Sequence, residues 1–585
     1  MAEFSKVVIT AKGQALLAKM IAGAGNVEFT KVCASSTGYT VDQLEALTSL
    51  SEVKQTSLIS KVTRTNNVAI KVETAFTNTE LTAGYYMRTL GLYALDPDDG
   101  EILYAATVET SGNCYVPPYN GITETGAYIT IVTTVGNAES VSLEVDSAAF
   151  ATIGDIRELE EKIADLQAFV GYTDSDIYGV EVDFVNKRFT RLAGAVNRTP
   201  GAGFDNIPCF GGRRRCNLKN DGTVTAYYGE AGFTTTGKAA DGSPVQVMVE
   251  QPKFYYKVVP LLTESNARGV AIRKARYYVS CTKKAGFKLH PAFISNTYSN
   301  EKIYLAAFEG SLWDSSAGTY ILDDSQVADF NADMLSSIAN AKPASGLTQN
   351  LTRANTRKLA QNRGGNWEQA YAATVSASQL LMLIEYASFD MQAAIGNGNV
   401  SKTDDGATSM TEITGATVNL GNASGVVVNT NGVQAVSYRG EENFWGNIWV
   451  WVDGINENND ATPWEAGAYG VLYVADHGFV DGTGTEPYKG TGIRPCHGQG
   501  YVSAFGYSEE FDWLFIPVEH TGNSALPVGD YMWNNNSGWR VAILGGLWYI
   551  GLRAGAFFWS LSAAASYRSR YFGGRLVYVP FRKVA

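Results

Sequence analysis

The chain lacks the features that mark several common classes of protein. It contains no run of about eighteen apolar residues, so we expect neither a membrane-spanning helix nor membrane insertion. Its first residues do not place a charged segment before an apolar one, so we expect no signal peptide. The net charge is −12 and no long basic run is present, which argues against nucleic-acid binding.

Cysteine and histidine are few and scattered. The four histidines match no zinc-protease or nucleophile-elbow pattern, and the adjacent Cys496 and His497 would point in opposite directions on an extended chain. We therefore predict that the chain is not an enzyme and holds no metal or cofactor. The six cysteines show no repeated spacing, which argues against a disulfide framework and indicates folding in a reducing cytoplasm. They are Cys33, Cys114, Cys209, Cys216, Cys281 and Cys496.

Two polar segments have competing interpretations. Residues 453–460 are rich in oxygen ligands for Ca²⁺, but they lack the EF-hand register, so a solvated turn is favoured. The run from Arg213 to Arg215 indicates a turn or an ion-pair site between subunits rather than a phosphate site. A carboxylate pair for glycan cleavage cannot be recognised from sequence among 58 acidic residues.

The composition is that of a folded protein with several domains. The 585 residues are 45% hydrophobic and 12% aromatic, enough to form more than one core. We predict a multi-domain α+β fold with three regions, at residues 1–150, 151–175 and 176–585.

The first region begins with a strand and a helix. Residues 7–9 are β-branched, and Thr10 can cap a helix that the glycines at 23 and 25 end. The predicted buried face of this helix consists of Leu16, Leu17, Met20 and Ile21.

Three strands are predicted after this helix. Residues 68–74 and 128–135 alternate with a period of two, and residues 88–94 form a third strand. This order resembles the N-terminal attachment domain of phage tail fibres and tail-collar proteins. The resemblance implies that residues 1–150 dock onto tail or baseplate proteins.

The second region carries a heptad pattern. Two heptads are too short to associate alone, so a coiled coil would form only where neighbouring domains bring its copies together. A single amphipathic linker helix is the alternative. The resemblance to tail fibres, which are usually trimeric, implies a homotrimer. The apolar positions are Ile156, Leu159, Ile163, Leu166 and Val170.

The third region mixes short strands with two helices. Alternating or aromatic runs at 180–184, 188–192 and 245–259 predict strands. One helix is predicted at 352–360, and a second begins at Ser376 or Ser378. The buried face predicted for the second helix consists of Leu380, Leu381, Leu383, Ile384 and Ala387.

Tryptophan is concentrated near the end of the chain, where nine of the eleven lie between Trp445 and Trp559. A buried aromatic core explains Trp445, Trp449 and Trp451 better than a sugar-stacking platform. The string from Arg439 to Trp449 reads RG-x-EN-x-WGN-x-W. It looks like a string of phage tail proteins with a C-type-lectin-like, or formylglycine-generating-enzyme-like, domain. The resemblance implies that fold for residues 176–585.

Residues 544–576 form the most informative segment. Glycines, tryptophans and arginines alternate there with residues that follow neither a period of two nor one of 3.6. This favours a rigid frame with interchangeable side chains over the closing strand of a core. The frame resembles the variable region of proteins diversified by phage and bacterial retroelements, an LGG-x-W…AGAF-x-W-x-L…R-x-R-x-x-GGRL skeleton in a C-type-lectin-like domain.

This resemblance implies a set of variable, ligand-binding positions. Adenine-directed mutagenesis in that family produces many residue types but not Lys, Glu, Gln, Met or Trp, and none of these occupies the inferred positions. Because a scaffold tolerates free replacement only where side chains point outward, we predict that the positions share one exposed face. They are Leu547, Tyr549, Ile550, Leu552, Arg553, Phe558, Ser560, Ser562, Ala563, Tyr567, Ser569 and Tyr571, with Phe572 the weakest candidate.

The function expected from these features is that of a phage tail fibre. The apolar, aromatic character of the predicted face favours a host cell-surface protein or glycoconjugate as the partner. The chain would be assembled in the host cytoplasm and reside in the virion tail. The alternatives are a prophage or bacterial lectin-like module without a tail and, less favoured, a glycan-cleaving tail spike.

Overall fold

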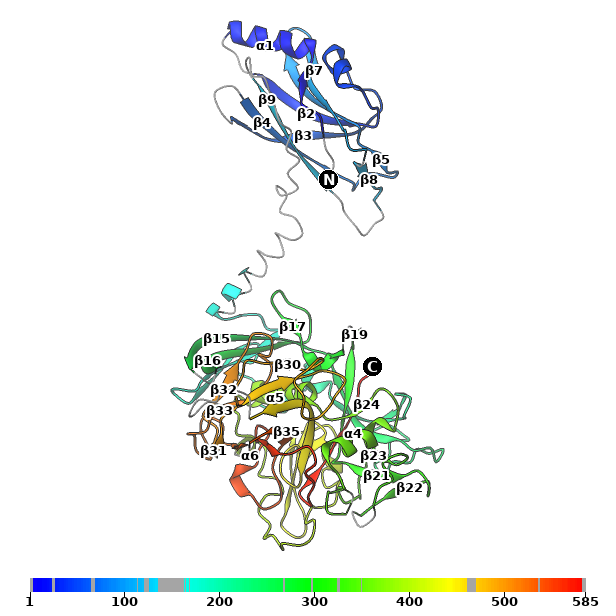
Figure 1. The fold of residues 1–585 in the computed structure, drawn as a ribbon, viewed down its shortest axis with the longest axis vertical. Helices are drawn as coiled ribbons and strands as arrows, with labels where there is room; N and C mark the ends of the chain where they lie inside the picture. The colour runs from blue at the N-terminus through cyan, green and yellow to red at the C-terminus, as the bar shows by residue number, and fades with distance from the viewer. Residues whose placement is uncertain are drawn as a thin grey trace. The chain divides into compact units, whose positions relative to one another are not determined.

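The computed structural model contains two compact units, Met1–Leu159 and Glu160–Ala585, each described by itself (Figure 1). Both consist mostly of β-strands with few helices. None of the helices in the described part is long and apolar enough to cross a membrane. The described residues are 4–580, apart from 24–26, 65–68, 113, 120–125, 135–161, 164, 168, 267–268, 296–297, 324–326, 349, 460–469 and 535–536.

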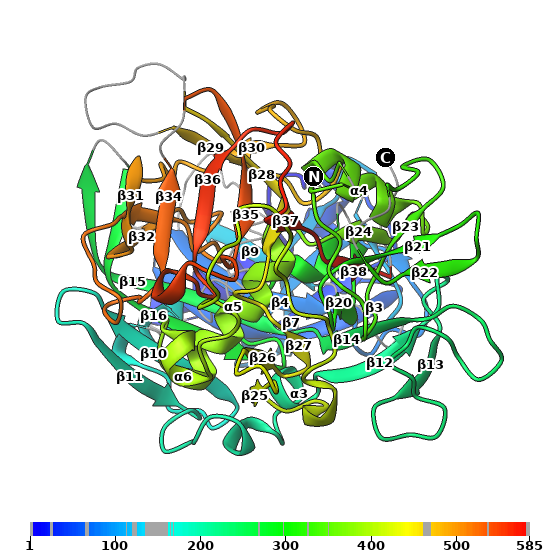
Figure 2. The same ribbon diagram turned by 90° about the horizontal axis from the view of Figure 1, so that it is seen from below.

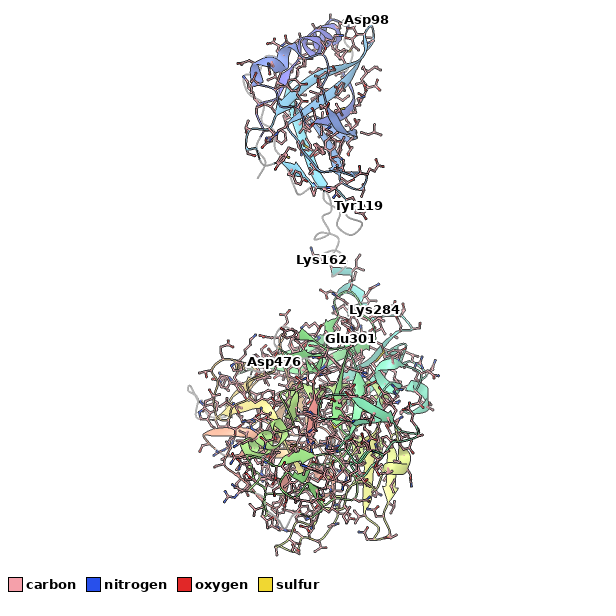
Figure 3. The ribbon with its side chains drawn as sticks, turned by 90° about the vertical axis from the view of Figure 1, so that its right-hand side faces the viewer. Asp98, Tyr119, Lys162, Lys284, Glu301 and Asp476 are labelled. Atoms are coloured by element: carbon pink, nitrogen blue, oxygen red, sulfur yellow. A yellow bond between two sulfur atoms is a disulfide. The ribbon has the colours of Figure 1, made fainter. Side chains whose placement is uncertain are left out.

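The first unit is built on a seven-stranded sheet in the order β1-β7-β6-β2-β3-β4-β9. The strands predicted at 68–74, 88–94 and 128–135 are β4, β6 and β9. Asp98 and Tyr119 mark opposite ends of this unit (Figure 3). The strands are β1 (Val8–Ile9), β2 (Glu28–Ser35), β3 (Val53–Arg64), β4 (Ala69–Thr77), β6 (Thr89–Asp96), β7 (Gly100–Val108) and β9 (Gly126–Thr134), with a separate pair β5 (Tyr85–Tyr86) and β8 (Tyr115–Val116).

Helix α1 (Ala11–Gly23) begins at the predicted cap and packs on β7. The hydroxyl of Thr10 accepts the N–H of Gly13 at 3.0 Å, which satisfies one of the helix's free donors. Gly13 is required there because a Cβ would lie 2.1 Å from the carbonyl oxygen of Tyr104. Leu16 is buried as predicted, but Ile21 is 66% exposed, so the predicted buried face is wrong for Ile21.

The second unit starts with helical residues between 162 and 170. Ile163, Leu166 and Val170 are 48%, 64% and 72% exposed, whereas Ile156 and Leu159 lie outside the described residues. The coiled coil therefore stays a prediction. Figure 3 places Lys162 and Lys284 toward the same end of this unit.

Two sheets of the second unit enclose its main core, together with the buried helix α5 (Ala372–Tyr386). One sheet has seven strands and contains the strands predicted at 180–184 and 188–192 as β10 and β11. Its strands are β10 (Ile177–Asp183), β11 (Arg188–Ala193), β15 (Tyr255–Asn266), β16 (Gly269–Ser280), β17 (Lys288–Leu289), β32 (Ala504–Tyr507) and β33 (Pro517–Glu519).

The other sheet has eight strands, in the order β30-β29-β28-β35-β36-β34-β31, with β37 paired to β28. Figure 2 shows β31, β34 and β36 side by side. The strands are β28 (Trp449–Asn458), β29 (Val471–Val474), β30 (Lys489–Gly490), β31 (Gly498–Tyr501), β34 (Tyr531–Asn534), β35 (Trp539–Leu544), β36 (Trp559–Ala563) and β37 (Phe572–Gly573).

Smaller sheets complete the second unit. A six-stranded sheet contains β12 (Arg214–Leu218), β13 (Val224–Tyr227), β14 (Gln246–Pro252), β20 (Lys302–Ala306), β24 (Trp367–Gln369) and β38 (Leu576–Tyr578). The others are β18 (Ile294–Ser295) with β19 (Tyr298–Ser299), β21 (Ser311–Asp314) with β22 (Thr319–Ile321) and β23 (Met334–Ser336), and β25 (Gly425–Val428) with β26 (Gln434–Tyr438) and β27 (Glu441–Glu442).

The two predicted helices of this unit exist, with one shifted boundary. Helix α4 (Arg353–Gln361) is capped by the hydroxyl of Thr352, which accepts the N–H of Asn355 at 3.2 Å. Helix α5 begins at Ala372, before the predicted Ser376, because its first turn is also buried. Leu380, Leu381, Leu383 and Ile384 are buried as predicted, and Ala387 ends the helix with a φ of +50°. Short α3 (Pro208–Gly211) and α6 (Met391–Ala394) complete the described α-helices.

The arginine run does not form a turn, and two of its three arginines, Arg213 and Arg215, are buried within the chain. β12 begins at Arg214, and the buried guanidinium of Arg213 forms an ion pair with Glu441 of the same chain. Arg215 is also buried and donates to the carbonyl oxygens of Gly440 and Thr417. The side chains of Arg213 and Arg215 thus bind Glu441 and Gly440, which belong to the RG-x-EN string, and hold that string beside β12.

Two further predictions are corrected. The supposed turn from Asp453 is the continuation of β28 to Asn458, and the buried carboxylate of Asp453 accepts two hydrogen bonds from Arg357. Cys209 and Cys281 are joined by a disulfide although their spacing in sequence gave no sign of it. Strand β16 ends one residue before Cys281, and α3 contains Cys209, so folding brings the two together.

Candidate functional site

The segment 544–576 is held by glycines at which no larger residue fits. Gly545 has a φ of +98°, and a Cβ there would lie 2.9 Å from the carbonyl oxygen of Phe444. At Gly555 a Cβ would lie 1.8 Å from a carboxylate oxygen of Asp530. The same carboxylate accepts the N–H of Phe557 at 2.6 Å, and burial raises its pKa well above the usual value. Gly545 therefore lets this segment lie against Phe444, and Gly555 lets it lie against Asp530, the residue before β34.

Residues at the start of β36 and just before it alternate between the two faces of the sheet. Phe557, Trp559 and Leu561 have no exposed surface and belong to the main core. Phe558 and Ser560 alternate with them and therefore point to the opposite face of the sheet. The prediction that this segment follows no period is wrong for residues 557–561, but a register shift against β35 ends the alternation before Ala563.

A second hydrophobic cluster, which we call the outer layer, covers that opposite face. Val450 and Val452 of β28 face the main core, whereas Trp449 and Trp451 alternate with them into the outer layer. Trp445, in the main core, is buried as well, so the buried interpretation of the three tryptophans is confirmed. The outer layer consists of Trp449, Trp451, Val541, Ile543, Leu547, Trp548, Phe558, Ala563 and Phe572.

The structure places the thirteen candidate positions at three depths. The exposed positions are Tyr549, Leu552, Arg553 and Tyr567. The half-buried positions are Ile550, Ser562, Ser569 and Tyr571. The buried positions are Leu547, Phe558, Ser560, Ala563 and Phe572. The prediction that the twelve positions other than Phe572 share one exposed face is wrong for four of them, which lie in the outer layer or directly beneath it: Leu547, Phe558, Ser560 and Ala563. Their role in ligand binding stays a prediction.

A charged cluster fixes one side of the outer layer. Arg570 forms ion pairs with Asp404 at 2.6 Å and Asp405 at 3.1 Å, and its guanidinium lies over the ring of Tyr571 at 4.4 Å. The indole N–H of Trp548 donates to Asp404 at 3.2 Å. The hydrogen bond from Arg570 lowers the pKa of Asp404, so the carboxylate stays charged at neutral pH. Asp404 and Asp405, which are far from residues 544–576 in sequence, thus border the outer layer on this side.

Aromatic and cationic side chains lie on the outer surface of this layer. The ring of Tyr549 contacts that of Tyr571 at 5.7 Å between centroids, and Tyr567 contacts Phe572 at 5.2 Å. The guanidinium of Arg553 lies 5.3 Å from the ring centre of Tyr531. Exposed tyrosines beside an arginine are the side chains that carry most binding energy in protein interfaces. The arrangement suits noncovalent binding.

Some residues of the site were missed by sequence reasoning. Tyr531 and Trp533 alternate with buried Met532 and Asn534, a period of two that a search for strands could have found. No pattern in the sequence identifies Asp404 or its neighbour as partners of Arg570.

The histidines lie in different surroundings, and Nδ1 of His477 is 2.5 Å from a carboxylate oxygen of the adjacent Asp476. His290 is fully buried between Phe254 and Tyr256, and burial lowers its pKa to about 3. His520 lies 3.1 Å from the carbonyl oxygen of His497. No group of three His, Cys, Asp or Glu side chains suited to a metal occurs in the part of the chain that the structure describes.

Comparison with known proteins identifies the first unit. Residues 1–154 match the family model described as phage tail-collar fibre protein, N-terminal. No curated protein matches the chain. The chain is similar to a solved structure titled Major Tropism Determinant U1 Variant, at 11% identity and a TM-score of 0.23, over 77% of this chain and 92% of that one. A TM-score this low does not establish a shared fold. The family match thus covers most of the first unit, and these comparisons leave the second unit without a family.

Proposed function

We propose that this chain is a receptor-binding tail fibre of a phage. Its first unit attaches it to tail or baseplate proteins, and the surface of the outer layer in its second unit binds a protein or glycoconjugate of the host cell. The match of residues 1–154 to the tail-collar fibre family carries the proposal, because it assigns the first unit to a virion component.

The geometry of the second unit supports a binding role. Tyr549, Leu552, Arg553 and Tyr567 are exposed on a rigid, buried support. A rigid support lowers the entropy that an interface loses on binding. The proposal includes a C-type-lectin-like fold for residues 176–585, diversification of the thirteen positions by a retroelement, and binding without cleavage of the ligand.

The helical residues after 161 support assembly into a homotrimer. Ile163, Leu166 and Val170 expose apolar surface in the single chain, and a parallel partner helix would cover it. Several copies would convert weak single contacts into firm attachment through effective concentration. Light scattering on the purified full-length chain tests this arrangement, and a monomeric mass would contradict it.

Diversification is tested by sequencing. The last codons of the gene are read across a clonal phage or bacterial population, and changes are counted position by position. We expect changes confined to the thirteen positions and derived from adenines in a nearby Asn-rich copy. Uniform or absent variation would leave a fixed binding face.

Binding is tested with the purified full-length chain and intact bacterial cells. A panel of strains is screened for retention of the chain, and the strain that retains it becomes the probe. We expect Arg553→Ala to lower retention about tenfold, as loss of a central interface arginine does. Arg188→Ala, at an exposed arginine of β11, is the matched control and should retain binding. Equal retention by both variants would overturn the proposed face.

A further inference from the structure

The two last strands at one edge of the eight-stranded sheet carry an uncharged strip that does not belong to the variable segment. β31 and β34 are antiparallel, with Tyr501 opposite Tyr531 and Gln499 opposite Trp533. Directly opposite residues of an antiparallel pair share a face. The three aromatic residues are half-buried and Gln499 is exposed. We call these four residues the constant strip.

The constant strip lies on the same face of the sheet as the variable positions. Tyr531 and Trp533 pack against the outer layer, while Met532, between them, belongs to the main core. β34 runs parallel to β36, with Trp533 level with Ser560. The strip therefore continues the variable surface sideways to the edge of the sheet.

Tyr531 joins the two surfaces. Its ring contacts that of Phe558 at 5.8 Å, and Arg553 lies over it at 5.3 Å. Its ring also contacts that of Tyr501 at 5.0 Å, nearly perpendicular. A ligand that touches Arg553 therefore meets Tyr531 next, and Tyr501 beyond it.

We propose that the constant strip is a fixed part of the ligand-binding face, and this rests on the function proposed above. Tyrosine and tryptophan supply large contact areas at low entropic cost. All four residues precede residue 544, so a change confined to the variable segment leaves them in place. The strip supplies contact energy common to all versions of the face, while Arg553 and the other exposed variable positions select the ligand.

The test uses intact cells of the strain that retains the unaltered full-length chain. Gln499→Arg adds a long charged side chain to the strip at an exposed position, so it blocks close approach without disturbing the core. Tyr501→Ala removes a half-exposed ring from the edge strand. Thr319→Arg, at an exposed position of β22, is the matched control, and Figure 2 shows β22 on the other side of this unit from β31.

We expect Gln499→Arg and Tyr501→Ala each to lower retention on the cells about tenfold, with unchanged thermal unfolding and unchanged oligomeric mass. Thr319→Arg should bind as the unaltered chain does. Full retention by both strip variants, with loss in Arg553→Ala, would overturn the constant strip and leave the proposed function standing. Full retention by all three would overturn both. A changed oligomeric mass in Gln499→Arg would assign the strip to a contact between copies and overturn the inference.

Discussion

The two faces of the eight-stranded sheet are packed in different ways. On the inner face, Trp559 and Leu561 enter the main core with helix α5 behind it. On the outer face, Phe558 enters a layer whose far side is the surface of the molecule, and a register shift between Ser560 and Ala563 brings Ala563 into the same layer. Alternate residues before the register shift thus belong to two different hydrophobic clusters. The diversification proposed above would be compatible with folding because the outer layer borders the surface, whereas the residues of the main core are buried.

The largest expected effect compares one leucine on each face. Leu561→Ala, in the main core, should lower the free energy of unfolding by about 3–5 kcal/mol, because the closed surroundings cannot fill the cavity. Leu547→Ala, in the outer layer, should cost about 2 kcal/mol, since the neighbouring chain can collapse from the solvent side. Chemical denaturation of the full-length chain, followed by tryptophan fluorescence, measures both. Equal losses would show that the outer layer is as closed as the core.

A buried carboxyl under the RG-x-EN-x-WGN string gives the next effect. Glu309 accepts hydrogen bonds from the side chains of Asn443 and Asn447, and burial raises its pKa from 4.5 to about 8. Its protonated form stabilises the fold, so this contribution is complete below about pH 4.5 and is lost as the pH rises to about 8.

Glu309→Gln removes this titration while keeping an oxygen for both asparagines. At pH 8.5 we expect the variant to be more stable than the unaltered chain, with a free energy of unfolding higher by on the order of a few kcal/mol and a higher unfolding temperature. At pH 5 we expect the two proteins to unfold at similar temperatures. Thermal unfolding at the two pH values measures it. A difference that is the same at both pH values would contradict a buried neutral acid.

The charged wall of the outer layer gives a smaller effect. Arg570→Lys should cost about 1–2 kcal/mol, because a lysine cannot reach Asp404 and Asp405 together or lie flat over Tyr571. The lowered pKa of Asp404 means that its contribution is present above the ordinary carboxyl pKa of about 4 and is lost as the pH falls further.

Unfolding curves between pH 3 and pH 7 test this prediction. The loss caused by Arg570→Lys should be largest at neutral pH and should begin to shrink below about pH 4, where Asp404 becomes protonated in the unfolded chain. Arg188→Lys, at an exposed arginine of β11, is the matched control and should change nothing. A loss independent of pH would mean that Arg570 acts only through packing.

The sequence predicts an interaction well when its residues are close together in the chain and poorly when they are far apart. The cap at Thr10 and the alternation in β4 and β9 are local, and both were found. The depth of Phe558 was missed because it depends on segments that fold back over the strand. The pair of Arg570 and Asp404 joins residues 166 positions apart, and no local pattern encodes such a contact.

The frame around the site was more accessible to prediction than the site itself. Only glycine fits at position 545, where φ is +98°, and at position 555, where a Cβ would meet the carboxylate of Asp530. The residue type at a proposed variable position gives no indication of its depth: Leu547 is buried and Leu552 is exposed. The alternation around β36 becomes visible only once Trp559 and Leu561 are known to face the main core.

The smallest expected effect completes the series of leucines. Leu552 is 52% exposed on the outer surface of the layer, so Leu552→Ser removes little buried area and should change the free energy of unfolding by less than about 0.5 kcal/mol. The same variant should lose retention on the bound strain, because it removes exposed apolar surface from the proposed face. Unfolding and cell retention are measured on one preparation. A stability loss as large as that of Leu547→Ala would show that Leu552 is covered in the assembled protein, and its surface would then belong to a contact between copies rather than to the ligand.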